Sequence, residues 1–319
     1  MKATVAANST RNVEAQAEGI RPTLVQHIPF AVWLIVPAEI VLLSVVVFPT
    51  LMSLWLSLTS WTPTSGVNWW QAEFQWLANY VQLLFGDERF RAALLRTLLI
   101  VVVGVAAEIS IGLSLALLFF DDFPWKKIAI SAIILPMMIV PVDAANAFFM
   151  LFRDVGPVNQ LVRILVGHPV RFAWLSDSNL AIVPILLVEI WQWTPLMFLM
   201  LLTGLMALPQ NQLRAAVALG ASRWQLFRRI ILPLIAPVVV LSLVIRSVEI
   251  FKIFDPVYIL TRGGPGTSTE TLSMWMYDNG FVYFRIAYVA AAGFLVLLVV
   301  LAYVLLILRP LSRRTAAER

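Results

Sequence analysis

The chain has 319 residues, of which 61% are hydrophobic and only 13% are charged, and its mean hydropathy is +0.87. A soluble domain carries about 45–50% apolar and about 25% charged residues, so the composition argues against a soluble globular protein and excludes a disordered one. The absence of cysteine and the presence of only two histidines exclude a disulfide framework, a thiolate nucleophile and a Cys- or His-rich metal centre.

Six apolar stretches are each long enough to cross a bilayer as a helix, which takes about 20 residues. They cover residues 29–57, 94–120, 127–152, 179–207, 232–256 and 286–309. None shows the period-two alternation of a barrel strand, and a lipid-exposed span must satisfy its own backbone hydrogen bonds. We therefore predict an all-α polytopic membrane protein with six transmembrane helices, in which Pro136 and Pro141 are tolerated as kinks of the third helix.

Lysine and arginine are concentrated in alternate connections of this predicted topology. They are Lys2, Arg11, Arg21, Lys126, Lys127, Arg214, Arg223, Arg228, Arg229, Arg309, Arg313, Arg314 and Arg319. The positive-inside rule then places both termini in the cytoplasm and explains the net charge of +5 without a nucleic-acid partner. The predicted organisation is a cytoplasmic tail over 1–28, a transmembrane domain over 29–309 in contact with membrane lipid, and a cytoplasmic tail over 310–319.

One cytoplasmic connection, residues 207–233, favours a helix that breaks at Gly220. Its apolar residues follow helical spacing and predict two exposed faces, which a membrane surface or a groove on a partner protein would cover. Small residues at this spacing favour close approach of a protein over lipid anchoring. The residues of this segment that we expect to contact a partner are Leu213, Arg214, Ala215, Ala216, Gly220, Ala221, Trp224 and Phe227.

The same segment resembles the coupling loop of ABC-importer permeases. That pattern is Glu-Ala-Ala, three residues, Gly, nine residues, Ile, one residue and Leu-Pro, and every fixed position matches except the first, where Arg214 replaces the glutamate. A second run, residues 261–271, reads TRGGPGTSTET and resembles the GGP loop of permeases for sugars and related solutes. Two further dipeptides, Asn79-Tyr80 and Phe254-Asp255, fit the same subfamily, so the chain looks like a carbohydrate permease of the maltose/glycerol-phosphate type.

This resemblance implies a type I ABC importer permease fold in a bacterial or archaeal inner membrane. It implies a heterodimer with a second homologous permease subunit, two ATPase subunits that bind ATP, an extracytoplasmic solute-binding protein and a sugar-like substrate. No G-x-x-x-x-G-K-[ST] phosphate loop occurs in the chain, in agreement with ATP binding elsewhere, and no cofactor is expected on this chain. The reversed charge at Arg214 leaves three readings open: a rearranged contact, an acidic residue on the ATPase, or poor coupling to the usual ATPase subunits.

Polar side chains inside membrane spans are costly and are usually paired or functional. Arg246, Glu249, Lys252 and Asp255 are spaced by three, which predicts a self-paired stripe, a lining of the translocation cavity, or both. The candidate substrate-binding residues are Glu189, Gln192, Trp193, Arg246, Glu249, Lys252, Asp143 and Asn146. For each tryptophan alone, packing between helices is an equal alternative, and for Glu39 and Glu108 we expect a structural hydrogen bond or a protonated carboxyl.

These residues do not form a set of nucleophile, base and orienting group, so we predict no catalytic residue and no metal site. The function that we expect is a permease subunit of an ATP-driven importer for a sugar or related polyhydroxylated solute. The alternative is an ion-coupled secondary transporter, in which the stripe 246–255 would be a relay. Such transporters usually carry internal repeats, and none is visible in this sequence.

Overall fold

The computed structural model describes residues 28–168 and 171–317. Except for Ile28, the predicted tail over 1–28 lies outside the described residues. The described residues divide into two compact units, the first ending at Trp55 and the second beginning at Leu56.

The first unit contributes a long apolar helical segment. It consists of α2 (Ile28–Leu42), the π-helical turn η2 (Leu43–Val47) and α3 (Phe48–Ser57), whose last two residues belong to the second unit. From Ile35 to Ser57 the segment is long and apolar enough to span a membrane, with a mean hydropathy of 2.2. Almost every side chain between residues 35 and 55 is exposed, as expected of a helix that lipid or another protein covers.

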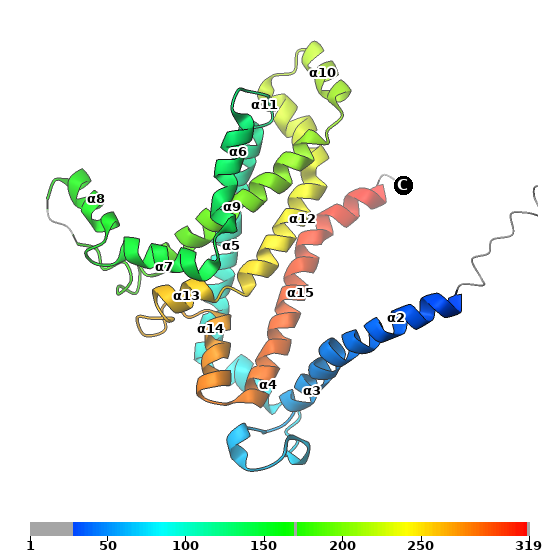
Figure 1. Cartoon of the computed structure of the whole chain (residues 1–319), viewed down its shortest axis with the longest axis vertical. Helices are drawn as coiled ribbons and strands as arrows, with labels where there is room; N and C mark the ends of the chain where they lie inside the picture. The colour runs from blue at the N-terminus through cyan, green and yellow to red at the C-terminus, as the bar shows by residue number, and fades with distance from the viewer. Residues whose placement is uncertain (1–27, 169–170, 318–319) are drawn as a thin grey trace, which may run out of the picture. The chain divides into compact units, whose positions relative to one another are not determined.

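The second unit is helical throughout its described part, apart from one isolated β-bridge between Thr59 and Phe74 (Figure 1). Its elements in chain order are η3 (Pro63–Ser65), η4 (Trp69–Gln71), α4 (Ala78–Val81), η5 (Gln82–Gly86), α5 (Glu88–Leu118), α6 (Lys126–Ile134), η6 (Leu135–Met138), α7 (Pro141–Phe152), α8 (Pro157–Val166), α9 (Ile182–Met206), α10 (Gln210–Ala218), α11 (Arg223–Leu226), η7 (Phe227–Ile231), α12 (Leu232–Phe251), α13 (Asp255–Leu260), α14 (Leu272–Tyr277), η8 (Asp278–Val282) and α15 (Ile286–Ala317).

Five helices of the described chain are long and apolar enough to cross a membrane, and the number is six if a bent pair of helices is counted as one span. The bent pair corrects the prediction for the third span, because Lys126–Met138 and Pro141–Val166 meet at 92° instead of forming one kinked helix over 127–152. The physical cause lies at Pro141. Its ring disfavours the helical conformation of the preceding residue, and Ile139 and Val140 are both extended.

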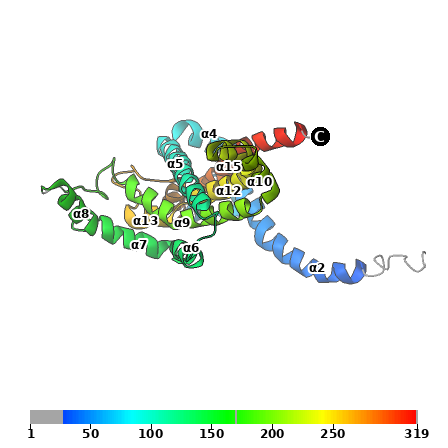
Figure 2. The ribbon, with the colours of Figure 1, turned by 90° about the horizontal axis from the view of Figure 1, so that it is seen from above.

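The core of the second unit lies between α5, α9 and α12. Small residues allow these helices to approach closely: a Cβ added at Gly112 of α5 would lie 2.9 Å from the Cβ of Met197 on α9, and one at Gly204 would lie 3.0 Å from Val238 on α12. Figure 2 shows that α6, α7 and α8 extend along one side of this bundle, with α8 farthest from it. In Figure 1, α10 and α11 lie at one end of the unit, and α4 and α14 lie at the other.

Candidate functional site

A buried ion cluster connects the three central helices. The guanidinium of Arg246 on α12 donates to both oxygens of Glu108 on α5, with Nε–Oε2 at 2.7 Å and Nη2–Oε1 at 2.8 Å. The same Nη2 donates to Glu189 on α9 at 2.9 Å, and the side chains of all three residues are at most 7% exposed. The Trp193 ring lies against the guanidinium, with 4.9 Å between its centroid and Cζ of Arg246. The structural hydrogen bond that was one of the two expectations for Glu108 is therefore found, and it is part of a bidentate ion pair with Arg246.

The stripe on the fifth span divides into a buried and an exposed part. Arg246 pairs with Glu108 and Glu189 on other helices. It forms no ion pair with Glu249, which lies one helical turn further along the chain. Glu249 pairs with Lys252 at 2.9 Å instead, and both side chains are more than half exposed. The expected pairing along the stripe is thus found for Glu249 and Lys252, which leave a polar surface available on the outside of the unit.

Gln192 stabilises the break in the third span. Its Nε2 donates to the carbonyl of Ile139 at 2.7 Å, immediately before the bend at Pro141. That bond replaces a partner which the carbonyl would have inside a continuous helix. The Oε1 atom of Gln192 is buried and has no hydrogen-bond partner among the described residues.

The other candidate substrate residues lie apart from the ion cluster. Asp143 and Asn146 are exposed on α7, where Asn146 Nδ2 donates to the Val142 carbonyl at 3.0 Å. The structure therefore brings Glu189 and Trp193 into contact with Arg246, buries Gln192 against the third span, and leaves Asp143, Asn146, Glu249 and Lys252 exposed.

The GGP loop after α13 is buried at its C-terminal end and connects two helices through an ion pair, at the end of the unit opposite α10. Thr269, Glu270 and Thr271 are all buried, with at most 1% of their surface exposed. Glu270 accepts two hydrogen bonds from Arg89 at the start of α5, one of them from Nε at 2.8 Å. Arg89 also pairs with Asp278 at 2.9 Å, so the charged motif residue holds the loop against two helices.

Backbone conformation explains the glycines of the same loop. Gly263 and Gly266 have φ values of +81° and +61°, which L side chains rarely adopt. The Thr269 hydroxyl donates to the carbonyl of Gly264 at 2.8 Å and closes the turn. The sequence motif that resembles the loop of sugar permeases thus has a structural role in this chain, because it holds the loop against neighbouring helices.

Replacing Glu270 by alanine is expected to lower the free energy of unfolding by about 1.5–3 kcal/mol, because it removes charge-assisted hydrogen bonds to Arg89. Thermal unfolding of the purified protein in detergent measures the change. The matched control is Asp122→Ala, which removes a fully exposed partner of Lys126 and should leave the transition where it is. Equal changes of the unfolding temperature for the two variants would contradict the stabilising role of Glu270.

The predicted coupling segment forms two helices with a break between them. α10 ends before Gly220, whose φ of +82° is the left-handed conformation of a helix C-terminus. α11 then begins with a capping box, in which the side chains of Ser222 and Gln225 bond reciprocally to the backbone. The helix break expected at Gly220 is therefore found.

The apolar residues of this segment point in two directions. Leu213 is buried and packs with Leu205 and Ile231 in the transmembrane core, so it anchors α10 to the bundle. Leu219 and Trp224 are 89% and 65% exposed and present apolar surface away from the bundle. Of the other candidates, Arg214, Ala215 and Gly220 are exposed, and Ala216, Ala221 and Phe227 are half-buried.

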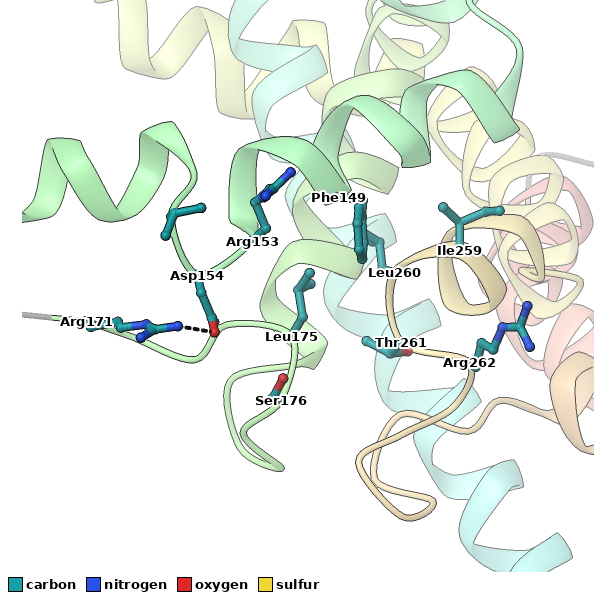
Figure 3. Close-up of a pocket in the computed structure, with 11 residues that line it drawn as sticks. Phe149, Arg153, Asp154, Arg171, Leu175, Ser176, Ile259, Leu260, Thr261 and Arg262 are labelled. Atoms are coloured by element: carbon teal, nitrogen blue, oxygen red, sulfur yellow. Dashed lines mark hydrogen bonds and ion pairs between the residues drawn. The ribbon is translucent and has the colours of Figure 1, made fainter.

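A large cavity opens near the C-terminal ends of α7 and α13 (Figure 3). None of its lining residues was a candidate site residue from the sequence. Its volume is about 910 Å³. The residues that line it are Phe149, Arg153, Asp154, Val155, Arg171, Leu175, Ser176, Ile259, Leu260, Thr261 and Arg262. Three of them, Arg153, Arg171 and Arg262, are arginines that lie in two connections between the predicted spans, and this charge is the signal that the sequence offered.

These features define a polytopic α-helical membrane subunit with an exposed helical pair at one end of its bundle. Residues 88–316 match the family described as the binding-protein-dependent transport system inner membrane component, and the chain belongs to this family. A probable ABC transporter permease protein, y4oQ from Sinorhizobium fredii, is 34% identical over 86% of this chain and 88% of its own length. The trehalose transport system permease protein SugA from Mycobacterium tuberculosis is 33% identical over 83% of each chain.

A solved structure shares the fold. One chain in the crystal structure of a bacterial alginate ABC transporter, in complex with an alginate pentasaccharide-bound periplasmic protein, superposes with a TM-score of 0.76 at 22% identity, over 91% of this chain and 96% of that chain. The predicted type I importer permease fold and the class of permease subunit are confirmed. ATP hydrolysis in this class belongs to separate ATPase subunits, and nothing supports the ion-coupled alternative.

Proposed function

We propose that this chain is one of two homologous membrane subunits of an importer that moves a sugar or a related polyhydroxylated solute into the cytoplasm. The relative SugA is named for trehalose transport, and the alginate importer of similar fold is named for a polysaccharide. The observation that carries the proposal is the α10–Gly220–α11 segment, which is anchored to the bundle at Leu213 and exposes its other apolar residues to a partner.

The polar outer faces of the unit favour a heterodimer. Lipid does not accept charged side chains such as Glu249 and Lys252 on a transmembrane helix, and both side chains are exposed in the single chain. A second permease would cover them and enclose a cavity to which Asp143, Asn146 and Trp193 also contribute. Purification of the tagged chain from native membranes should recover a homologous partner with six spans, and recovery of homodimers alone would contradict this assembly.

The two remaining kinds of partner follow from the family. Two ATPase subunits would bind ATP and receive the segment from Leu213 to Phe227 in the cytoplasm, and an extracytoplasmic binding protein would deliver the solute at the opposite end. The distribution of arginine and lysine supports this orientation, with both termini in the cytoplasm of a bacterial or archaeal inner membrane.

Cysteines introduced at Glu249 and Lys252 are expected to react with a small hydrophilic thiol reagent, because these positions face an aqueous cavity in the proposed heterodimer. The natural chain has no cysteine, so labelling reports on the new thiol alone. Ile250→Cys, which is buried, should stay unlabelled, and Leu241→Cys, on an exposed apolar position of the same helix, should react only with lipid-soluble reagents. Labelling of 249 and 252 by lipid-soluble reagents alone would overturn the cavity assignment.

A further inference from the structure

The cavity between α7 and α13 has an unusual balance of charge. Arg153, Arg171 and Arg262 line it, and Asp154 is the one carboxylate among its lining residues (Figure 3). Asp154 is paired with Arg171. Among the described residues, neither Arg153 nor Arg262 forms an ion pair with a carboxylate, so these two arginines at the cavity are positive charges without an acidic partner.

The walls that carry these arginines are held in place by buried hydrogen bonds. Asn159 is 5% exposed, and its Nδ2 donates to the carbonyls of Asp154 at 3.1 Å and Phe172 at 2.9 Å. Its Oδ1 accepts from the backbone N–H of Phe172 and from Nε1 of Trp174, both at 3.1 Å. One fully satisfied amide therefore fixes the turn after α7 against the segment that follows Arg171.

A tight turn fixes the direction of the chain beside Arg153. The Gly156 N–H donates to the Arg153 carbonyl at 2.7 Å. A Cβ at Gly156 would lie 2.4 Å from the carbonyl oxygen of Leu151, so only glycine fits this turn.

Arg262 occupies a conformation that glycine would adopt at lower cost. Its φ is +52°, and its N–H caps α13 by donating to the Val257 carbonyl at 2.8 Å. The left-handed region disfavours a side chain by about 1–2 kcal/mol. Its guanidinium lies over the Tyr258 ring, 5.1 Å from the centroid, which stabilises the cation without neutralising it.

The remaining lining suits a carbohydrate. Phe149, Leu175 and Ile259 provide apolar surface for the C–H faces of a sugar ring, and Ser176 and Thr261 provide hydroxyl groups. A volume of about 910 Å³ lies within the range of about 300–1,000 Å³ that is typical of small-molecule sites. Arginine is the side chain best suited to bind carboxylate, sulfonate or phosphate oxygens.

We propose that this cavity binds the acidic group of an anionic carbohydrate, so that the solute of this importer carries a carboxylate, sulfonate or phosphate. This inference rests on the proposed function, because it assigns a substrate class to the same transport pathway. Arg153 and Arg262 provide the positive charge, and Asp154 reduces it by holding Arg171.

The test compares two disaccharides that differ in one acidic group: glucuronic acid linked to glucose, and the neutral disaccharide of two glucose units. Equilibrium binding to the purified membrane complex is measured in nanodiscs of zwitterionic lipid at low salt, without the binding protein. We expect the acidic disaccharide to bind about tenfold more tightly, as one charge-assisted contact predicts. The double variant Arg153→Gln/Arg262→Gln should lose this difference, and Arg163→Gln, an exposed arginine of α8 that does not line the cavity, should keep it.

A second variant tests the proposal by a gain of affinity. Asp154→Asn removes the carboxylate that holds Arg171, so it should strengthen binding of the acidic disaccharide relative to that of the neutral one. Equal affinity of the wild-type complex for both sugars, or no binding of the acidic one, would overturn the acidic site while ATP-driven import, which is measured separately, could still hold. A double variant that keeps the preference but loses association with the binding protein would also overturn it, and would assign the arginines to protein docking.

Discussion

Replacing Arg246 by methionine is expected to lower the free energy of unfolding by about 3–5 kcal/mol, because it leaves two buried carboxylates without a counter-charge. Glu108 and Glu189 come from different helices, and one guanidinium satisfies both of them. Methionine fills much of the same space, so the loss reflects charge and hydrogen bonding more than volume. Thermal unfolding of the purified complex in detergent measures the effect.

The matched control for Arg246 is the residue that follows the same helix. Lys252→Met removes the exposed partner of Glu249, and its cost should stay under about 1 kcal/mol. Adding Glu108→Gln and Glu189→Gln to Arg246→Met should recover part of the lost stability, because the buried charges disappear together. An unfolding temperature that is equally lowered by Arg246→Met and Lys252→Met would contradict the role of the buried cluster.

Replacing Gly220 by tryptophan is expected to abolish solute-stimulated ATP hydrolysis while the chain stays folded and inserted. A Cβ at this position meets no atom within 4 Å, so the fold bears only the cost of a left-handed backbone, about 1–2 kcal/mol. The large side chain would occupy the surface between α10 and α11 that we assign to the ATPase. Co-purification of the ATPase subunits and their hydrolysis rate are the two measurements.

Gly66→Trp is the matched control for Gly220→Trp. Gly66 has a φ of +70° and likewise meets nothing within 4 Å, but it lies in the connection between α3 and α4. It should bear the same backbone cost and keep the ATPase subunits bound. If Gly220→Trp assembles and transports at the wild-type level, then this segment does not couple the chain to the ATPase. In the same assay, Arg214→Glu should strengthen assembly if the family contact is retained, and should weaken it if the ATPase carries an acidic partner.

Hydropathy predicted the spans because a bilayer imposes a minimum length of apolar helix. The second span begins at Glu88, six residues before the predicted start, because Arg89 and Arg96 are held by the buried Glu270. Charged residues lower the mean hydropathy of a sequence window, although each of these arginines has a polar partner within the protein. That partner, Glu270, lies 181 residues from Arg89, so the local sequence cannot predict the contact.

The bend in the third span shows a different limit of prediction from sequence. Pro136 and Pro141 were both visible, but a proline can either kink a helix or end it. Which outcome occurs depends on whether another element donates a hydrogen bond to the backbone carbonyl that loses its helical partner. Here Gln192 of α9 donates to the carbonyl of Ile139, and predicting this hydrogen bond requires knowledge of how two helices pack.

The polar stripe on α12 shows the same dependence on packing. Spacing by three predicts contacts along one helix, and Glu249 does contact Lys252. Arg246 instead contacts acids that lie 138 and 57 residues away in the chain. The rotation of α5, α9 and α12 about their axes decides this choice, and it follows from close contacts such as that between Gly112 and Met197.

Uptake by the reconstituted transporter is the decisive test of whether this chain belongs to an ATP-driven importer that depends on a binding protein. The chain, copurified with its second permease and ATPase subunits, is placed in proteoliposomes with its binding protein and the solute identified by mass spectrometry in that protein. Uptake is expected to require both ATP and the binding protein, and Gly220→Trp is expected to stop it. Uptake that follows an imposed ion gradient without ATP, or that continues at the same rate without the binding protein, would contradict this expectation.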